Sequence, residues 1–370
     1  MDDRILVATR KGLFTIKRDN GRWVIRDVAL MGEHISMVLP DPRDGTIHAA
    51  MSMGHFGCKM RRSRDGGKTF TESPAPEYPP LAEGEEPVKD PMRGFEIPNA
   101  LKLIWSLEIG DPRQPGTLWC GTAPGGLFRS DDGGDTWQIV RSLWDNPSRR
   151  KWFGGGYDYA GIHTICVDPT NTRRVYVAIS TGGVWLTEDG GKSWQTRAKG
   201  LRNEYMPPDQ AGDPDSQDVH RLALCAANPD VMWIQHHNGI FHSTDAGRNW
   251  REIENVKPSV FGFPVVAHPK DANTAWFVPA VKDEVRVPAH GKVVVNRTRD
   301  GCKSFQTLSK GLPQEHAYDL VYRHGLDIDA TGNRLVMGST TGSLWVSEDR
   351  GDSWQTVAEH LPPIYVVRFG

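Results

Sequence analysis

Short apolar runs separated by polar turns cover the whole chain. In one stretch, apolar residues dominate at 162–167, 175–179 and 184–186, and Asp, Pro, Thr and Gly lie between these runs. Runs of this length that are bounded by turn-forming residues predict β-strands. A polar turn and Trp194 then begin a fourth run. The repeating unit is therefore predicted to have four strands, A to D in chain order, joined mostly by short turns.

A second pattern recurs at the turn between strands C and D. It reads Ser/Thr-x-Asp-x-Gly-x-x-Trp/Phe, and we call it the repeated turn. Its copies begin at Ser63, Ser130, Thr187, Ser243, Thr298 and Ser347, and in the copy at Thr298 the glycine is replaced by Cys302. Short Ser, Thr and Asp side chains accept backbone N–H bonds in tight turns, and glycine tolerates a positive φ. We interpret the repeated turn as structural, despite its polar residues.

Four-stranded units at a regular period predict the blades of a β-propeller. Strands A are predicted to begin near Ile35, Ile104, Ile162, Val219, Phe261, Leu320 and Ile364, and the sixth of these starts either at Leu320 or nearer Arg323. The last of these has no strand B after it, whereas residues 5–8, 12–16 and 23–25 provide B, C and D without an A. The two ends therefore complete one blade, which removes two open sheet edges.

The sequence thus predicts an all-β fold, a seven-bladed β-propeller of four-stranded antiparallel blades. The first blade is closed by the C-terminal strand together with three N-terminal strands, and residues 1–370 form a single domain. Two separate domains are the alternative.

Composition narrows the expected partners and location. The formal net charge is −2, which gives no general attraction to nucleic acid, and no apolar run of 18 residues could span a membrane. The acidic start at residues 1–4 and the short run after it do not form a signal peptide. The five cysteines are far apart and predict thiols in a reducing compartment. We expect a cytoplasmic protein without nucleic-acid or membrane partners and without a nucleotide cofactor; its oligomeric state is left open.

The connections between strands indicate which face is functional. In a propeller, A–B and C–D turns lie on one face, and D–A and B–C connections lie on the other. The repeated turns therefore mark the first face, and the long connections 71–103, 138–161, 195–218 and 280–292 lie on the second. Long loops in a compact domain are usually functional. We expect the site at the channel mouth on the face opposite the repeated turns.

Histidines, acids and aromatic residues gather on that second face. Neutral imidazole is a ligand for transition metals, and His and carboxylate groups serve as general acids and bases. The candidate ligands of a divalent transition metal are His163, His220, His236, His237 and His324. The candidate catalytic residues are His163, His220, Asp158, Asp218, Asp319 and Glu284. The candidate substrate-binding residues are Trp152, Tyr157, Trp105, Arg10, Lys282, Arg323 and His316. For each single histidine a structural role is the alternative, and 282–286 could be an exposed, salt-bridged loop tip.

The repeated turns make the chain resemble the BNR/Asp-box superfamily of propellers. This group includes sialidases, xyloglucan-type glycosidases, sortilin-like receptors and photosystem II assembly factors. The segments 10–14, 152–158 and 277–285 resemble a bacterial group labelled WD40/YVTN/BNR-like repeat or glycosyl hydrolase BNR repeat. The resemblance covers the chain and implies the fold, but such folds carry unrelated activities.

The chain departs from two of these families. Sialidases carry a Phe/Tyr-Arg-Ile-Pro motif that grips a carboxylate, whereas residues 95–98 read Phe-Glu-Ile-Pro, and Glu96 would repel a carboxylate. Sialidases are also typically six-bladed. The xyloglucan enzymes use two propellers that face each other across a cleft, whereas this sequence predicts one propeller. A conventional sialidase is therefore not expected.

Two functions remain open. The first is a hydrolase or lyase that acts on a small molecule or glycan, using His and Asp/Glu as acid and base, either with or without a His-bound metal. A glycosidase of this kind needs two carboxylates about 5 to 9.5 Å apart. The second is a non-catalytic scaffold that binds a protein, a peptide or a sugar.

Overall fold

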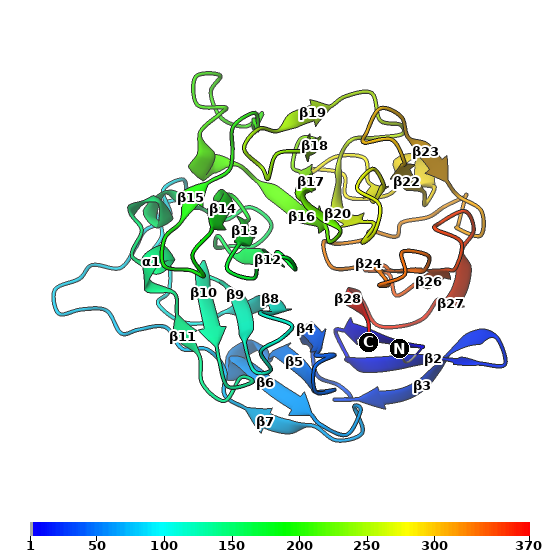
Figure 1. Cartoon of the computed structure of the whole chain (residues 1–370), viewed down its shortest axis with the longest axis horizontal. Helices are drawn as coiled ribbons and strands as arrows, with labels where there is room; N and C mark the ends of the chain where they lie inside the picture. The colour runs from blue at the N-terminus through cyan, green and yellow to red at the C-terminus, as the bar shows by residue number, and fades with distance from the viewer. Residues whose placement is uncertain (1–2) are drawn as a thin grey trace.

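Seven four-stranded antiparallel sheets form a ring in the computed structural model, which describes residues 3–370 (Figure 1). The predicted all-β, seven-bladed propeller is confirmed. In every blade strand A is innermost and strand D outermost, and consecutive strands A pack side by side around the channel. Short helical segments lie only in the connections, the α-helix α1 (Arg141–Trp144) among them.

Each blade runs from strand A at the channel to strand D at the rim. Blade 1 contains β28 (Ile364–Phe369), β1 (Arg4–Thr9), β2 (Gly12–Asp19) and β3 (Arg22–Ala29). Blade 2 contains β4 (Ile35–Pro40), β5 (Ile47–Ser52), β6 (Cys58–Ser63) and β7 (Thr71–Ser73). Blade 3 contains β8 (Leu103–Ile109), β9 (Leu118–Ala123), β10 (Gly126–Ser130) and β11 (Gln138–Ile139). Blade 4 contains β12 (Ile162–Val167), β13 (Val175–Ile179), β14 (Gly183–Thr187) and β15 (Gln195–Thr196).

The remaining blades follow in chain order. Blade 5 contains β16 (Val219–Cys225), β17 (Asn228–His236), β18 (Ile240–Ser243) and β19 (Arg251–Ile253). Blade 6 contains β20 (Gly262–Ala267), β21 (Ala275–Pro279), β22 (Val295–Thr298) and β23 (Gln306–Leu308). Blade 7 contains β24 (Leu326–Ile328), β25 (Leu335–Gly338), β26 (Leu344–Ser347) and β27 (Gln355–Ala358). The 3₁₀ turns are η1 (Gly54–Phe56), η2 (Pro147–Lys151), η3 (Pro214–Ser216) and η4 (Ala289–Gly291).

The two ends of the chain close the ring as predicted. Strand β28 pairs antiparallel with β1, from Ile5 opposite Phe369 to Thr9 opposite Ile364, and the termini lie together in this blade (Figure 1). This pairing gives β1 a hydrogen-bonded neighbour on its inner side, and β28 takes the innermost position that strand A has in every other blade.

The predicted starts of strands A are confirmed for most blades. Four of them are correct to the residue, and the predictions at Ile104 and Phe261 are off by one. The prediction at Leu320 is wrong, because strand A of blade 7 begins at Leu326. Residues 322–325 instead form a turn, closed by a hydrogen bond from the Gly325 amide to the Tyr322 carbonyl. This turn brings Arg323 and His324 to the mouth of the channel.

The repeated turn is held by hydrogen bonds among its own residues. In the copy at Ser130, the hydroxyl accepts from the Gly134 amide at 2.8 Å and donates to Asp132 at 2.8 Å, while Asp132 accepts from the Thr136 amide at 2.8 Å. The copy with Cys302 keeps this geometry, because the Cys302 amide donates to Thr298 at 2.9 Å. The interpretation of the repeated turn as structural agrees with these contacts.

The core lies between blades as well as within them. Trp250 follows the repeated turn of blade 5 and packs against Ala198 and Leu201, which follow blade 4. Its indole donates to the Arg197 carbonyl at 2.9 Å. Such wedges seal neighbouring sheets because an aromatic side chain removes a large apolar area from water.

The predictions from composition also concern the cysteines and the helices. All five cysteines are thiols without a disulfide partner. Within residues 3–370, no helix has the length and apolar character that crossing a membrane requires.

Candidate functional site

Six of the seven strands A carry a β-bulge at the same place, next to the start of the strand. In five of them the residue skipped by the pairing register is Ser36, Trp105, His163, His220 or Tyr365. In β20 the irregularity spans Phe263 and Pro264. Bulges are frequent next to functional sites because they redirect a side chain out of the regular alternation. The bulges thus bring one residue from each of six blades to the mouth of the channel.

Aromatic and imidazole rings at the mouth contact one another from blade to blade. Phe263 stacks on His220 with ring centroids 4.5 Å apart and meets Tyr322 edge-on at 5.0 Å. On the opposite side Trp105 contacts His163 at 5.5 Å. These contacts link blades 3 and 4 on one side, and blades 5, 6 and 7 on the other.

A cavity of about 330 Å³ opens between these rings; we call it the mouth pocket. Aromatic walls and a few polar groups are typical of small-ligand sites of this size. The residues that line it are His34, Ser36, Ser52, Leu103, Trp105, Gly156, Tyr157, Tyr322, Arg323, His324, Tyr365 and Val366.

Arg323 is the charged group at the wall of the mouth pocket. It is 4% exposed, and its guanidinium lies 5.1 Å from the ring centre of Trp105 and 5.3 Å from that of Phe263. Its Nε and Nη2 find no hydrogen-bond partner in residues 3–370. Burial lowers the pKa of Arg323 to about 10, so it stays charged at neutral pH. Arg323 therefore places a buried positive charge, with two donors that are unpartnered in the described chain, at the wall of the mouth pocket.

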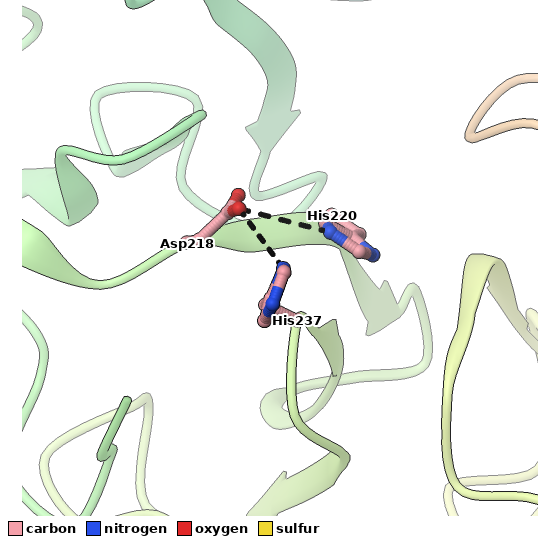
Figure 2. Close-up of side chains that lie close together, drawn as sticks. All are labelled: Asp218, His220 and His237. Carbon is pink, nitrogen blue, oxygen red and sulfur yellow. Dashed lines mark ion pairs between the residues drawn. The ribbon is translucent and has the colours of Figure 1, made fainter. Parts of the chain in front are cut away.

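Asp218, His220 and His237 form a cluster, which we call the Asp–His–His cluster (Figure 2). Arg323 is close enough to lower the pKa of Asp218. Oδ2 of Asp218 lies 3.4 Å from Nδ1 of His237 and 3.8 Å from Nε2 of His220. Asp218 immediately precedes β16, His220 is its bulged residue, and His237 follows β17. The His237 amide donates to the Asp218 carbonyl at 2.9 Å, which fixes the turn beside the strand start. Both segments belong to blade 5, and this is how the fold brings the three side chains together.

Burial and charge set the protonation of this cluster. Burial alone would raise the pKa of Asp218, but His237, His220 and Arg323 hold it well below its usual range. Burial lowers the pKa of His220 to about 3. Burial also lowers the pKa of His237, but the Asp218 carboxylate outweighs this and the net shift is upward. At neutral pH an ionised carboxylate therefore faces a neutral His220.

A glycine loop covers the cluster and Arg323. A Cβ atom on Gly155 would lie 2.5 Å from Oγ1 of Thr181 and 3.0 Å from Oδ2 of Asp218. A Cβ atom on Gly156 would lie 2.6 Å from Nη2 of Arg323. The backbone of the Gly154–Gly156 run can approach these polar groups only because it has no side chains there.

The structure brings together two of the six candidate catalytic residues, Asp218 and His220. His163 lies at the same level in the next blade. Glu284 is exposed in an ion pair with Lys282 at 3.3 Å, and Asp158 is exposed beside Tyr157. Asp319 accepts hydrogen bonds from Ser339 at 2.8 Å and from Thr341, which ties down its own loop.

Among the five candidate metal ligands, His220 and His237 lie close together. Asp218, which was predicted as a catalytic residue, lies beside them. Their ligand atoms lie within 4.8 Å of one another, and no other group of three His, Cys, Asp or Glu side chains in the described chain does so. His324 instead faces Arg221, with 2.8 Å between Nδ1 and Nη1. His163 pairs with Thr164 at 2.9 Å. Nδ1 of His236 accepts from the Asn238 amide at 3.4 Å.

Of the candidate substrate-binding residues, Trp105, Tyr157 and Arg323 line the mouth pocket. Trp152 is 1% exposed and packs against Trp185, so it belongs to the core. Arg10, Lys282 and His316 are exposed and do not line the pocket. Sequence reasoning missed Tyr322, Phe263 and Tyr365. Two of these lie just after the start of a strand A, a position that could have been searched in every blade.

Comparisons with known proteins agree with this fold. No protein-family model matches the chain. A probable oligoxyloglucan-reducing end-specific xyloglucanase of Neosartorya fischeri is 33% identical over 174 residues, which is 46% of this chain and 18% of that protein. The enzyme of that name from Emericella nidulans is 33% identical over 86 residues, 23% of this chain and 10% of that protein. The matches thus span less than a fifth of these relatives.

Solved structures extend the likeness to the whole ring. The GH74 xyloglucanase of Xanthomonas campestris superposes with a TM-score of 0.65 at 19% identity, over 98% of this chain and 53% of that chain. YCF48 from Cyanidioschyzon merolae gives 0.56 at 14% identity, over 94% and 96%. The likeness to the propellers of GH74 xyloglucanases and YCF48 is confirmed. At these identities it shows the fold alone.

Proposed function

We propose that the chain is a hydrolase that binds a carbohydrate in the mouth pocket and cleaves it beside the Asp–His–His cluster. The observation that carries the proposal is the position of Arg323. This residue both lines the aromatic pocket and contributes to the field that keeps Asp218 ionised. The mouth pocket and the Asp–His–His cluster are therefore connected through Arg323.

The walls of the mouth pocket suit a sugar. Trp105, Tyr157, Tyr322 and Tyr365 offer flat apolar faces, and Arg323 and His34 offer polar atoms. Rings of this kind pack against the C–H face of a pyranose, while polar groups bond its hydroxyls. The volume of about 330 Å³ accommodates a small ligand. Two curated relatives with 33% identity in their matched segments carry the name xyloglucanase, which also supports a glycan.

The reactive groups differ from those of most glycosidases. Such enzymes place two carboxylates about 5 to 9.5 Å apart. In the Asp–His–His cluster one carboxylate lies with two imidazoles. We infer that this cluster activates the attacking water, and that Arg323 stabilises negative charge that develops on a substrate oxygen.

Oligosaccharide binding and cleavage test the proposal. The purified chain is titrated with neutral and acidic oligosaccharides, xyloglucan fragments among them, and new reducing ends are measured. Trp105→Ala is expected to weaken binding about tenfold or more, because a buried aromatic contact is worth about 1.5 kcal/mol or more. Asp218→Asn is expected to abolish cleavage while binding persists.

Tyr318→Ala is the matched control, because Tyr318 is 64% exposed and does not line the mouth pocket. Binding without cleavage by the wild-type chain would contradict the hydrolase and favour a non-catalytic binding role. Cleavage that survives in Asp218→Asn would contradict the assignment of the reactive cluster.

A further inference from the structure

The donor atoms of the Asp–His–His cluster have the spacing of a metal site. Oδ2 of Asp218 lies 3.4 Å from Nδ1 of His237 and 3.8 Å from Nε2 of His220. Tetrahedral Zn²⁺, with bonds of about 2.0 to 2.2 Å, needs ligand atoms about 3.4 Å apart. Adjacent ligands of an octahedral Mg²⁺ ion, with bonds of about 2.1 Å, lie about 3.0 Å apart. The two distances from Asp218 are therefore within about 0.4 Å of the tetrahedral value, and all three ligand atoms lie within 4.8 Å of one another.

The hydrogen bond of His220 fixes which nitrogen faces the cluster. Its Nδ1 lies 2.6 Å from the Gly262 carbonyl, which can only accept, so Nδ1 carries the proton. Nε2 then directs a lone pair toward the Asp218 carboxylate, and two acceptors face each other. A metal-binding histidine commonly donates its second nitrogen to a backbone carbonyl in this way.

The second oxygen of Asp218 gives independent support. Asp218 is 5% exposed, and its Oδ1 has no hydrogen-bond partner among the described residues. A buried carboxylate oxygen without a partner is costly, and bound cations are one of the ways in which proteins compensate buried charge. A cation at this position would be bonded by the carboxylate and would separate its oxygens from Nε2 of His220.

We propose that Asp218, His220 and His237 bind one divalent transition-metal ion, with Zn²⁺ as the best match. Three protein ligands leave one coordination position open, as in catalytic zinc sites. The side chain of His237 is 24% exposed, so the cluster can be reached from solvent. Arg323 is a cation close to the cluster, and its repulsion is expected to make the affinity lower than that of an isolated site.

The chemical role of the ion rests on the proposed function. An ion beside the mouth pocket polarises an oxygen of water or of the bound ligand. Ion binding itself does not depend on that role. The metal site and the proposed hydrolase activity can therefore be disproved independently of each other.

Calorimetric titration of the whole, chelator-treated chain with Zn²⁺ tests the site. The wild type is expected to bind one equivalent with a dissociation constant of roughly micromolar or tighter, and to gain thermal stability. His237→Ala removes a ligand that is partly exposed and is expected to weaken binding by about a hundredfold or more. Asp218→Asn is expected to weaken it by at least about tenfold. His34→Ala, a change in the mouth pocket outside the cluster, is expected to leave Zn²⁺ binding unchanged.

Two results would overturn the metal site. One is a wild-type chain that binds no Zn²⁺, and the other is unchanged affinity in both His237→Ala and Asp218→Asn. If His220→Ala fails to fold, these two variants still decide the question. Stoichiometric Zn²⁺ binding without oligosaccharide cleavage supports the site and contradicts the proposed hydrolase. Cleavage by a chain that binds no Zn²⁺ would support the proposed hydrolase and contradict the metal site.

Discussion

Polar side chains on the two faces of the propeller differ in how completely they are hydrogen-bonded. On the face of the repeated turns, Ser130 and Asp132 form hydrogen bonds with each other and with the amides of the turn. At the channel mouth, Arg323 keeps Nε and Nη2, and Asp218 keeps Oδ1, without partners in the described chain. Among the described residues, unpartnered buried atoms occur near the repeated turns as well, the indole nitrogen of Trp354 among them, but the mouth places an unpartnered cation and an unpartnered carboxylate close to each other.

This difference separates structure from function. Burial of a polar atom without a partner costs stability, and at the channel mouth a bound ligand or ion would compensate that cost. The repeated turn is the more conspicuous polar motif in the sequence, but its polar atoms are already satisfied. Substitutions on the two faces should therefore have opposite profiles, with lost stability on one face and lost binding on the other.

The largest effect is expected for Arg323→Met. The loss of charge-assisted hydrogen bonds worth about 2–3 kcal/mol should weaken oligosaccharide binding about a hundredfold. The free energy of unfolding should stay within about 1 kcal/mol of the wild type or rise, because a buried cation replaced by an apolar chain is often neutral or stabilising. Calorimetry and urea denaturation measure the two quantities. A large loss of stability with binding retained would make Arg323 structural and break the comparison.

Acid is expected to destabilise the protein through histidines that are held neutral. Burial lowers the pKa of His163 and His324 at the mouth, and that of His242 from 6.5 to about 4. The unfolded chain then binds protons more readily, so stability is fully present above about pH 6.5 and falls as the pH drops toward 4. Each histidine contributes at most about 1.4 kcal/mol per pH unit.

Urea denaturation between pH 7.5 and 4.5 measures this slope. Glu108 and Asp327, whose pKa values are raised by burial, partly oppose it as they protonate. The variant His242→Gln isolates one histidine from this sum. If it leaves the slope unchanged, His242 does not hold a lowered pKa in the folded protein.

Ser130→Ala tests the other face. The substitution leaves the Gly134 amide without its acceptor, and an unsatisfied buried N–H costs about 1–3 kcal/mol. The midpoint of urea denaturation should fall, while oligosaccharide and Zn²⁺ binding stay at wild-type values. A loss of binding equal to that of Arg323→Met would mean that the repeated turn communicates with the mouth.

Much of the fold could be predicted from the sequence because its signals are local. The repeated turns fix the strand C–D hairpins, and apolar runs fix most starts of strands A. The start at Leu320 was wrong because the segment before β24 is held by contacts that are distant in sequence, such as the bond from the Thr340 amide to the Leu320 carbonyl. A local run of apolar residues does not predict such long-range contacts.

The site was harder to predict because side-chain direction depends on the bulges. Asp218, His220 and His237 were each candidates, but their meeting in blade 5 follows from the register skip at His220. Asp319 and Glu284 have the same residue chemistry and lie in similar loops, yet their partners are Ser339 and Lys282. Residue type supplied the candidates, and three-dimensional pairing decided between them.

The smallest effect in this series, and the most specific, is expected for Gly156→Ala. A Cβ atom would lie 2.6 Å from Nη2 of Arg323, and the flexible end of that side chain can move, so stability should change little. The displaced guanidinium should weaken oligosaccharide binding about tenfold, the equivalent of about 1.4 kcal/mol. Gly212→Ala is the matched control, because a Cβ atom there meets nothing within 4 Å. Equal binding by the two variants would show that the position of Arg323 does not matter to the ligand, and the contrast between the two faces would then rest on Asp218 alone.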